Sequence, residues 1–290
     1  IQDALCRVLA VWSLENPDIS YKQGMHELLG LLFLVLHRDS EAADARESGP
    51  GLGPDQGSGL GPGMSPGMSP GSGLGPGLGP GVDPGPSPGM SPGLSLGPGL
   101  EWEELTGDEM DVEEDACLTD GRYLEHDAYE LFDAVMKGPG KGMITHYSIA
   151  AKGSFSAPER VLNLLKIVDP QLHQHLQDLD ISVATFLLRW LRLMFGREFH
   201  FEDVIMLWDS LFALTAKLRR PSGLSEVVEA FAAAMIIFVR PSLIEFQDSH
   251  MCLRRLLKFP PVEDLTVLIK TACDLLPLTR QERNRLGTCA

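Results

Sequence analysis

The chain has 290 residues, of which 44% are hydrophobic, and a formal net charge of −16. Residues 101–127 hold 12 acidic side chains and one base, so the acidity is local and no broad basic face is left to bind nucleic-acid phosphates. The five cysteines form no Cys-x-x-Cys pair, which excludes a disulfide framework and a structural zinc site as organising features.

The first 48 residues are predicted to form two helices. Apolar residues recur at helical spacing from Leu5 to Trp12, which predicts an amphipathic helix over residues 2–14. An Asn-Pro-Asp break follows, and a second, more apolar helix is predicted from Gln23 to about residue 38. Because the chain opens directly in a helix and lacks an initiator Met, we expect it to be a fragment or an alternative product.

Residues 49–119 have a composition unlike the rest of the chain. The stretch 49–100 contains 19 of the 30 glycines and 12 of the 21 prolines, and its irregular glycine spacing excludes a collagen triple helix. We predict a disordered, Gly/Pro-rich and acidic insert here. It would divide one domain into an N-terminal part, residues 1–48, and a C-terminal part, residues 120–278, followed by a tail at 279–290.

The C-terminal part shows repeated helical periodicity and almost no alternation with period two. Proline at position 158 suits the first turn of a helix. The segment between the glycines near 140 and that proline has few apolar anchors and is expected to be a loop. Helices are predicted over about 123–137, 158–168, 171–179, 183–195, 201–213, 225–239, 241–257 and 261–276. The fold class is therefore predicted to be all-α, and no apolar run reaches the ~18–20 residues needed to span a bilayer.

Two motifs stand out against this helical background. Residues 21–28 read Tyr-Lys-Gln-Gly-Met-His-Glu-Leu, which places the uncharged amide of Gln23 at the mouth of a nearly apolar helix. Gly24 would let the chain turn there without a Cβ clash. Residues 188–199 form an Arg-Trp helix and a polar Phe-Gly-Arg-Glu-Phe elbow, and a Trp-Asp pair follows at Trp208. We expect these aromatic residues to pack the helices.

Together, the two motifs and the Glu-His-Asp-Ala-Tyr run at 125–129 resemble the TBC domain family, the Rab GTPase-activating module. The resemblance implies an all-α domain that accelerates GTP hydrolysis by a Rab protein and is not itself an enzyme. In that family a glutamine orients the attacking water, and this role falls on Gln23. An amide suits the role because its carbonyl accepts a hydrogen bond while its NH₂ group donates. Further partner-binding residues implied by the motifs are Tyr21, Lys22, Gly24, His26 and Arg197.

The arginine that completes TBC catalysis does not match this chain. Its family motif, Ile-x-x-Asp-x-x-Arg, lies some tens of residues before the glutamine. Ile1, Asp3 and Arg7 approximate it, but the aspartate is one position early, so Arg7 is interpreted as a helix-surface residue. Since an arginine finger contributes roughly 10³–10⁵ in rate, weak or absent activity is expected for the chain as it stands.

Two alternatives stay open. The chain could be a non-catalytic TBC-fold scaffold that binds a Rab or an endosomal, retromer-type coat, or it could be a truncated structural fragment. The resemblance implies a cytoplasmic protein, peripheral on endosomal membranes, in vesicle traffic and autophagy. No phosphate-binding Gly-x-x-x-x-Gly-Lys-Ser/Thr loop is present, so GTP and Mg²⁺ would be held by the partner GTPase and the chain would need no cofactor of its own. Arg197, Glu198 and Asp209 could instead form a structural ion-pair and capping set.

Overall fold

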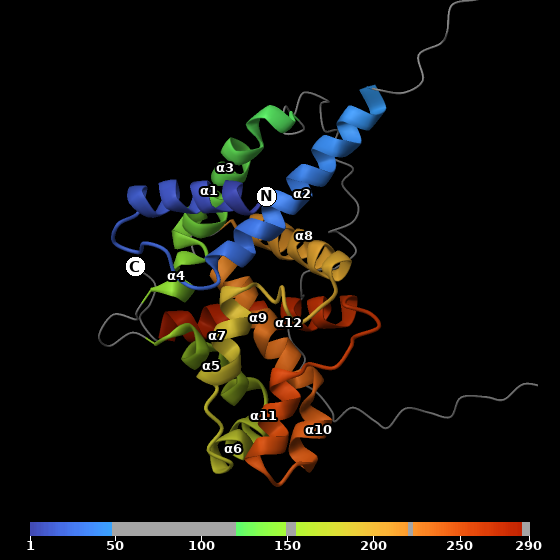
Figure 1. The fold of residues 1–290 in the computed structure, drawn as a ribbon. Helices are drawn as coiled ribbons and strands as arrows, with labels where there is room; N and C mark the ends of the chain where they lie inside the picture. Colours follow the sequence, from blue (N-terminus) through green and yellow to red (C-terminus); the bar gives the residue numbers. More distant parts are fainter. Residues whose placement is uncertain (48–119, 149–154, 220–222, 286–290) are drawn as a thin grey trace, which may run out of the picture.

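The computed structural model describes residues 1–47, 120–148, 155–219 and 223–285. Every regular element within these ranges is a helix, which confirms the predicted all-α class (Figure 1). The predicted insert at 49–119 lies outside the described residues, so the domain boundaries drawn around it stay predictions.

Twelve α-helices and one short 3-10 helix make up the described part of the chain. In chain order they are α1 (Gln2–Glu15), α2 (Met25–Glu47), η3 (Gly121–Tyr123), α3 (Leu124–Lys141), α4 (Ile144–Tyr147), α5 (Ala157–Val168), α6 (Pro170–Asp178), α7 (Ala184–Arg192), α8 (Phe201–Leu218), α9 (Gly223–Phe238), α10 (Arg240–Glu245), α11 (Ser249–Leu257) and α12 (Thr266–Arg285).

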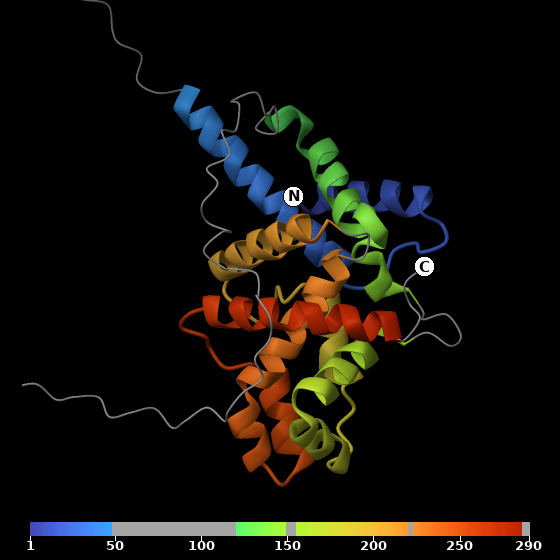
Figure 2. The same ribbon diagram turned by 180° about the vertical axis from the view of Figure 1, so that it is seen from behind.

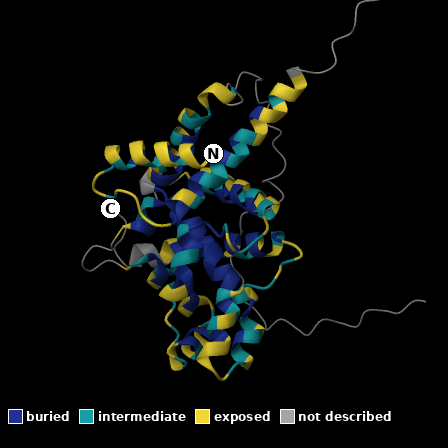
Figure 3. Cartoon of the chain, viewed as in Figure 1, coloured by how far each residue is buried: buried dark blue, intermediate teal, exposed yellow. Residues whose placement is uncertain are grey.

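Helix α9 forms the centre of the molecule. All of its residues from Gly223 to Ile236 are buried, and α5, α7, α8, α10 and α12 pack around it (Figure 3). Apart from Ser225, Glu226 and Glu229, the helix is apolar on all sides, as a fully surrounded helix requires. Figures 1 and 2 show α12 crossing α9, with α1–α3 at one end of the molecule and α6, α10 and α11 at the other.

Helices α1, α2 and α3 pack against one another as a group. The Trp12 ring is fully buried and meets Phe132 edge-on, with the ring centroids 5.4 Å apart. Its Nε1 donates a hydrogen bond to Asp133 Oδ1 at 2.8 Å, so the indole nitrogen is satisfied. A Cβ built on Gly121 would lie 2.7 Å from Ser40 Oγ, which shows that η3 lies against α2. The polypeptide therefore leaves α2 and re-enters at η3 at the same end of the molecule.

Several predicted boundaries were wrong: α3 continues to Lys141, α8 continues to Leu218 instead of 213, α12 begins at Thr266 instead of 261, and α4 lies in the segment expected to be a loop. Helix α2 continues to Glu47 instead of ending near residue 38, because its polar second half is rich in alanine and glutamate, which favour helix even without an apolar stripe. Helix α12 continues through Pro277 to Arg285, beyond the predicted end at 276. The single helix predicted over 241–257 is two helices, because the Asp248 side chain accepts a hydrogen bond from the His250 N–H and starts α11 afresh.

Candidate functional site

Gln23 lies in a tight turn between α1 and α2. The Met25 N–H donates to the Lys22 carbonyl at 3.1 Å, and the Lys22 N–H meets Met25 Sδ at 3.2 Å. The Met25 side chain is fully buried. Gly24 has φ +104°, a conformation that side chains other than glycine's rarely adopt. The turn is thus anchored in the core directly after Gln23, while α2 carries the chain away from it.

The Gln23 side chain itself is exposed. Within the described ranges it has no hydrogen-bond partner, so the carboxamide is available to an incoming molecule. This bears on the water-orienting hypothesis, because a buried amide at this position would have ruled that role out. The neighbouring side chains of Tyr21, Lys22 and His26 are exposed on the same segment, whereas Gly24 is buried.

Polar pairs flank the turn. The Tyr21 hydroxyl and His26 Nδ1 are 2.8 Å apart. Arg197 makes two contacts with Glu27 in the first turn of α2: Nε lies 2.6 Å from Oε2, and the terminal NH2 nitrogen lies 2.9 Å from Oε1. The Arg197–Glu27 pair therefore joins the segment after Gln23 to the second sequence motif, although the two lie far apart in the chain.

Helices α4 and α7 lie beneath the turn. A Cβ built on Gly24 would lie 3.0 Å from Leu193 Cδ2 and 3.4 Å from Tyr147 Oη. The buried Tyr147 hydroxyl donates to the Arg192 carbonyl at 2.7 Å, and Arg192 Nε donates to the His146 carbonyl at 3.0 Å. A side chain at position 24 would therefore press on Leu193 and Tyr147 and would also be strained by the positive φ.

The elbow after α7 has an unusual backbone. Met194 and Phe195 have φ of 42° and 64°, a left-handed conformation that is uncommon for such large residues. Both side chains are fully buried, and Trp208 Nε1 donates to the Met194 carbonyl at 2.9 Å, which holds the elbow to α8. The predicted core role of this aromatic motif is confirmed, and the elbow is what brings Arg197 to Glu27.

Of the residues expected to form a structural ion-pair and capping set, Arg197 and Glu198 do form ion pairs, each with a residue outside the set, whereas Asp209 forms none within the described residues. Glu198 pairs with Arg189, whose Nε lies 2.8 Å from Oε1, while Arg197 pairs with Glu27. Asp209 joins neither pair, and desolvation raises its pKa. The two ion pairs therefore fix separate contacts, that of Glu198 with α7 and that of Arg197 with α2.

Arg7 lies on α1 and pairs with Glu125 on α3, with its Nε 3.0 Å from Oε2. The Arg7 side chain is 62% exposed, so Arg7 is a surface residue, as the sequence interpretation held. The hydrogen bond with the Glu125 carboxylate raises the pKa of Arg7 and lowers that of Glu125. Its contact is a structural one between two helices.

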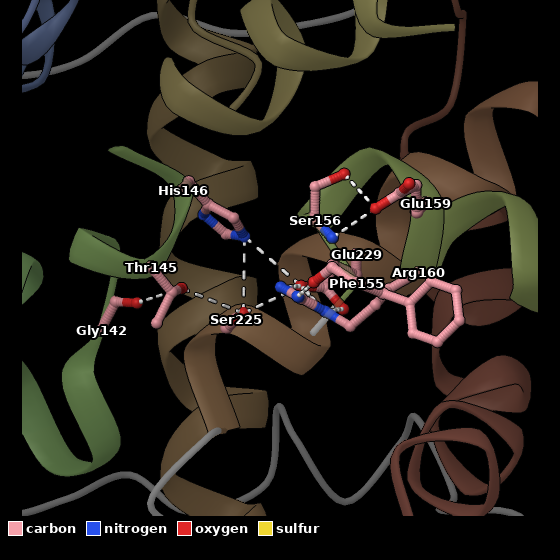
Figure 4. Close-up of polar contacts among 9 residues, drawn as sticks. All are labelled: Gly142, Thr145, His146, Phe155, Ser156, Glu159, Arg160, Ser225 and Glu229. Atoms are coloured by element: carbon pink, nitrogen blue, oxygen red, sulfur yellow. Dashed lines mark hydrogen bonds and ion pairs between the residues drawn. The ribbon is translucent and has the colours of Figure 1, made fainter. Parts of the chain in front are cut away.

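A buried polar cluster near α4 was not predicted from the sequence (Figure 4). Glu229 on α9 accepts hydrogen bonds from Arg160 on α5, with the terminal NH2 nitrogen 2.6 Å from Oε1, and from Ser225 Oγ at 3.0 Å. His146 Nε2 lies 3.4 Å from Ser225 Oγ and 3.5 Å from Glu229 Oε1. Serine and carboxylate face the same ring nitrogen, so the arrangement is not a nucleophilic triad, in which they face opposite nitrogens. The available signal was a glutamate in an apolar helix, which must find a partner.

The described residues contain no group of three or more His, Cys, Asp or Glu side chains placed to hold a metal ion. His173 and His175, two positions apart in α6, have different surroundings: His173 is buried, while His175 Nε2 contacts the Leu243 carbonyl at 2.9 Å. In the same ranges, no helix is long and apolar enough to cross a bilayer.

Comparisons with known proteins agree on one family. Residues 121–244 match the model of the Rab-GTPase-TBC domain. TBC1 domain family member 5 homolog B of Dictyostelium discoideum is 45% identical over 112 residues, which cover 39% of this chain and 10% of that protein. Human TBC1 domain family member 5 is 28% identical over 307 residues, covering 98% of this chain and 30% of that protein. This chain therefore spans less than a third of the length of these relatives.

The fold also matches a solved structure. The Ypt/Rab-GAP domain of Gyp1p superposes with a TM-score of 0.56 at 19% sequence identity, over 97% of this chain and 66% of that one. At this level of identity the match establishes the helical architecture.

Proposed function

We propose that the chain, whose residues 121–244 match the model of the Rab-GTPase-TBC domain, is a member of that family and stimulates GTP hydrolysis by a Rab-family GTPase. The observation that carries the proposal is the exposed Gln23 carboxamide on a turn anchored by the buried Gly24 and Met25. The chain supplies the amide, and the partner supplies GTP, Mg²⁺ and the attacking water.

The chemistry of the amide supports this role. Phosphoryl transfer needs little covalent help from the activator and depends on positioning and on stabilising charge. The Gln23 carbonyl would accept a hydrogen bond from the water while its NH₂ group donates to the nucleotide or to the GTPase backbone. Tyr21, Lys22 and His26 are exposed around it and would contact the partner. Arg197 would contribute at the rim through its pair with Glu27.

The missing arginine limits the expected rate. The sequence contains no Ile-x-x-Asp-x-x-Arg motif, and Arg7 is engaged with Glu125. Because an arginine finger is worth roughly 10³–10⁵ in rate, we expect stimulation by this chain alone to be weak.

We propose as a second candidate function a TBC-fold scaffold that binds a Rab-family GTPase without accelerating hydrolysis, because Arg7, the residue that approximates the family arginine, is engaged with Glu125. We further propose a cytoplasmic location, peripheral on endosomal membranes, with a retromer-type coat as another partner in vesicle traffic and autophagy. This setting rests on the resemblance to TBC1 domain family member 5 proteins.

Single-turnover hydrolysis over a panel of GTP-loaded Rab proteins, paired with a binding measurement for each, tests both candidates. A GTPase whose hydrolysis rises with increasing concentration of the chain supports the activator. Binding without acceleration by any panel member supports the scaffold. Neither binding nor acceleration would overturn both.

A further inference from the structure

We propose that Tyr147 is the positioning residue for Gln23: from beneath, it holds the turn that presents the carboxamide. The inference rests on the proposed function and assigns a residue to it outside both sequence motifs. Tyr147 would never touch the partner, because its side chain is almost completely buried, with 3% of the residue exposed.

The first step is the contact between Tyr147 and the turn. A Cβ built on Gly24 would lie 3.4 Å from Tyr147 Oη and 3.8 Å from Cε1, so the hydroxyl edge of the ring lies against the backbone directly after Gln23. Leu193 Cδ2, at 3.0 Å from the same point, closes the other side. Glycine is the residue with the most backbone freedom. A glycine at φ +104° keeps one conformation only if its surroundings restrain it.

The second step is that Tyr147 is itself fixed. Its hydroxyl donates to the Arg192 carbonyl at 2.7 Å at the end of α7. Burial raises the pKa of Tyr147, so the hydroxyl keeps its proton and stays a donor throughout the neutral range. The Arg192 guanidinium lies 5.5 Å from the ring centroid and covers the ring face. The ring cannot rotate away without losing these contacts.

The third step is the anchoring of α4. A helix of four residues has little stability of its own. The residue before Tyr147 in this helix, His146, is held at two points. Its carbonyl accepts a hydrogen bond from Arg192 Nε of α7 at 3.0 Å. Its ring contacts the buried Ser225 and Glu229 of α9 (Figure 4). Tyr147 thus connects the most buried helix of the domain to the Gln23 turn.

Tyr147→Phe tests the proposal because it keeps the ring and removes only the hydroxyl. Tyr123→Phe is the matched control, since Tyr123 is exposed on η3. Using a GTPase that the wild-type chain stimulates, we expect Tyr147→Phe to lower the maximal stimulated rate to near the intrinsic rate of the GTPase, with unchanged affinity, because a small misplacement of a positioned group is enough to lose its effect. In a Gln23→Ala background the same change should lower the rate no further, because its effect passes through the amide. A loss of affinity in place of rate, or a rate loss that persists without Gln23, would overturn the proposal.

A second measurement does not depend on activity. Amide hydrogen exchange of the free chain, followed by mass spectrometry on peptides that cover residues 21–28, should be faster in Tyr147→Phe than in wild type or Tyr123→Phe. Unchanged exchange in this segment would overturn the positioning role even if a GTPase is stimulated. If no GTPase is stimulated but exchange rises as expected, the restraint on the turn stands and the proposed function fails instead.

Discussion

Arg197 and Glu27 form a two-point ion pair that joins the elbow after α7 to the first turn of α2, four residues after Gln23. Arg197 is 60% exposed and Glu27 is 25% exposed at the side chain. The pair therefore lies at the rim of the site, where water screens the attraction. The pair holds two segments that are distant in the sequence next to each other, and neither charge is fully buried.

An exchange of charges at this pair should show that the two residues interact. Arg197→Glu and Glu27→Arg are each expected to lower the free energy of unfolding by about 0.5–1 kcal/mol. The double variant should be more stable than the sum of the single effects predicts, because opposite charges again face each other. Urea unfolding at low and high salt measures this coupling, which salt should weaken. Strict additivity of the two changes would contradict the contact.

Gly24→Ala should destabilise the domain. The new Cβ would lie 3.0 Å from Leu193 Cδ2 on a backbone with φ +104°, a conformation that costs a non-glycine residue about 1–3 kcal/mol. Gly30→Ala is the matched control on the same stretch: its Cβ would find Leu5 Cδ1 at an ordinary 3.9 Å in the interior of α2. That change should stabilise by about 0.5–1 kcal/mol. Thermal unfolding of both variants tests this, and equal effects would refute the description of the turn.

Arg160→Met should be the most damaging single charge removal. The Glu229 side chain is 1% exposed and that of Arg160 is 13% exposed, so loss of the arginine leaves a buried carboxylate without its main counter-charge. Such a loss costs about 3–5 kcal/mol. Arg38→Met removes an exposed pair with Glu202, at 52% and 77% exposure, and should cost no more than about 1 kcal/mol. Chemical denaturation that found the two variants equally stable would disprove the buried network.

Glu159 should contribute stability in a pH-dependent manner. Its carboxylate accepts from the Ser156 N–H at 2.6 Å and from the Ser156 hydroxyl at 2.8 Å at the start of α5, and these bonds lower its pKa. The unfolded chain therefore binds the proton more readily, so the contribution is complete above the usual pKa of 4.5 and is lost as the pH falls through the folded value.

Glu159→Ala should accordingly cost about 1 kcal/mol at neutral pH and progressively less below the usual carboxyl pKa. Stability of wild type and variant between neutral and acidic pH gives the comparison, with Glu130→Ala, an exposed glutamate of α3, as control. A difference that stays constant on acidification would show that the capping box does not act through the carboxylate.

Much of this site was predictable from the sequence because its parts lie in motifs with a clear spacing. Gln23 stood out because its polar amide lies between a helix-breaking Asn-Pro-Asp segment and an apolar helix. Trp190 and Trp208 were expected in the core, where they lie. Helix ends were less predictable. The polar half of α2 has no apolar stripe, so periodicity gave no signal that the helix extends to Glu47.

The support beneath the site was not predictable in the same way. Tyr147 lies in a four-residue helix within a segment expected to be a loop, and so short an element carries no periodicity. Its relation to Gly24 and Arg192 depends on tertiary packing across distant segments. Glu229 did carry a signal, since a carboxylate in an apolar helix needs a partner, but the sequence does not identify Arg160 and His146 as those partners.

The central claim is that the exposed amide of Gln23 acts on a partner's hydrolytic water. Its most direct test is single-turnover GTP hydrolysis by a responsive Rab protein with Gln23→Ala, compared with Gln177→Ala, which removes an exposed glutamine of α6 at the other end of the molecule. The account predicts that Gln23→Ala binds the GTPase but returns hydrolysis to its intrinsic rate, while Gln177→Ala stimulates like wild type. Undiminished stimulation by the Gln23→Ala variant would contradict it.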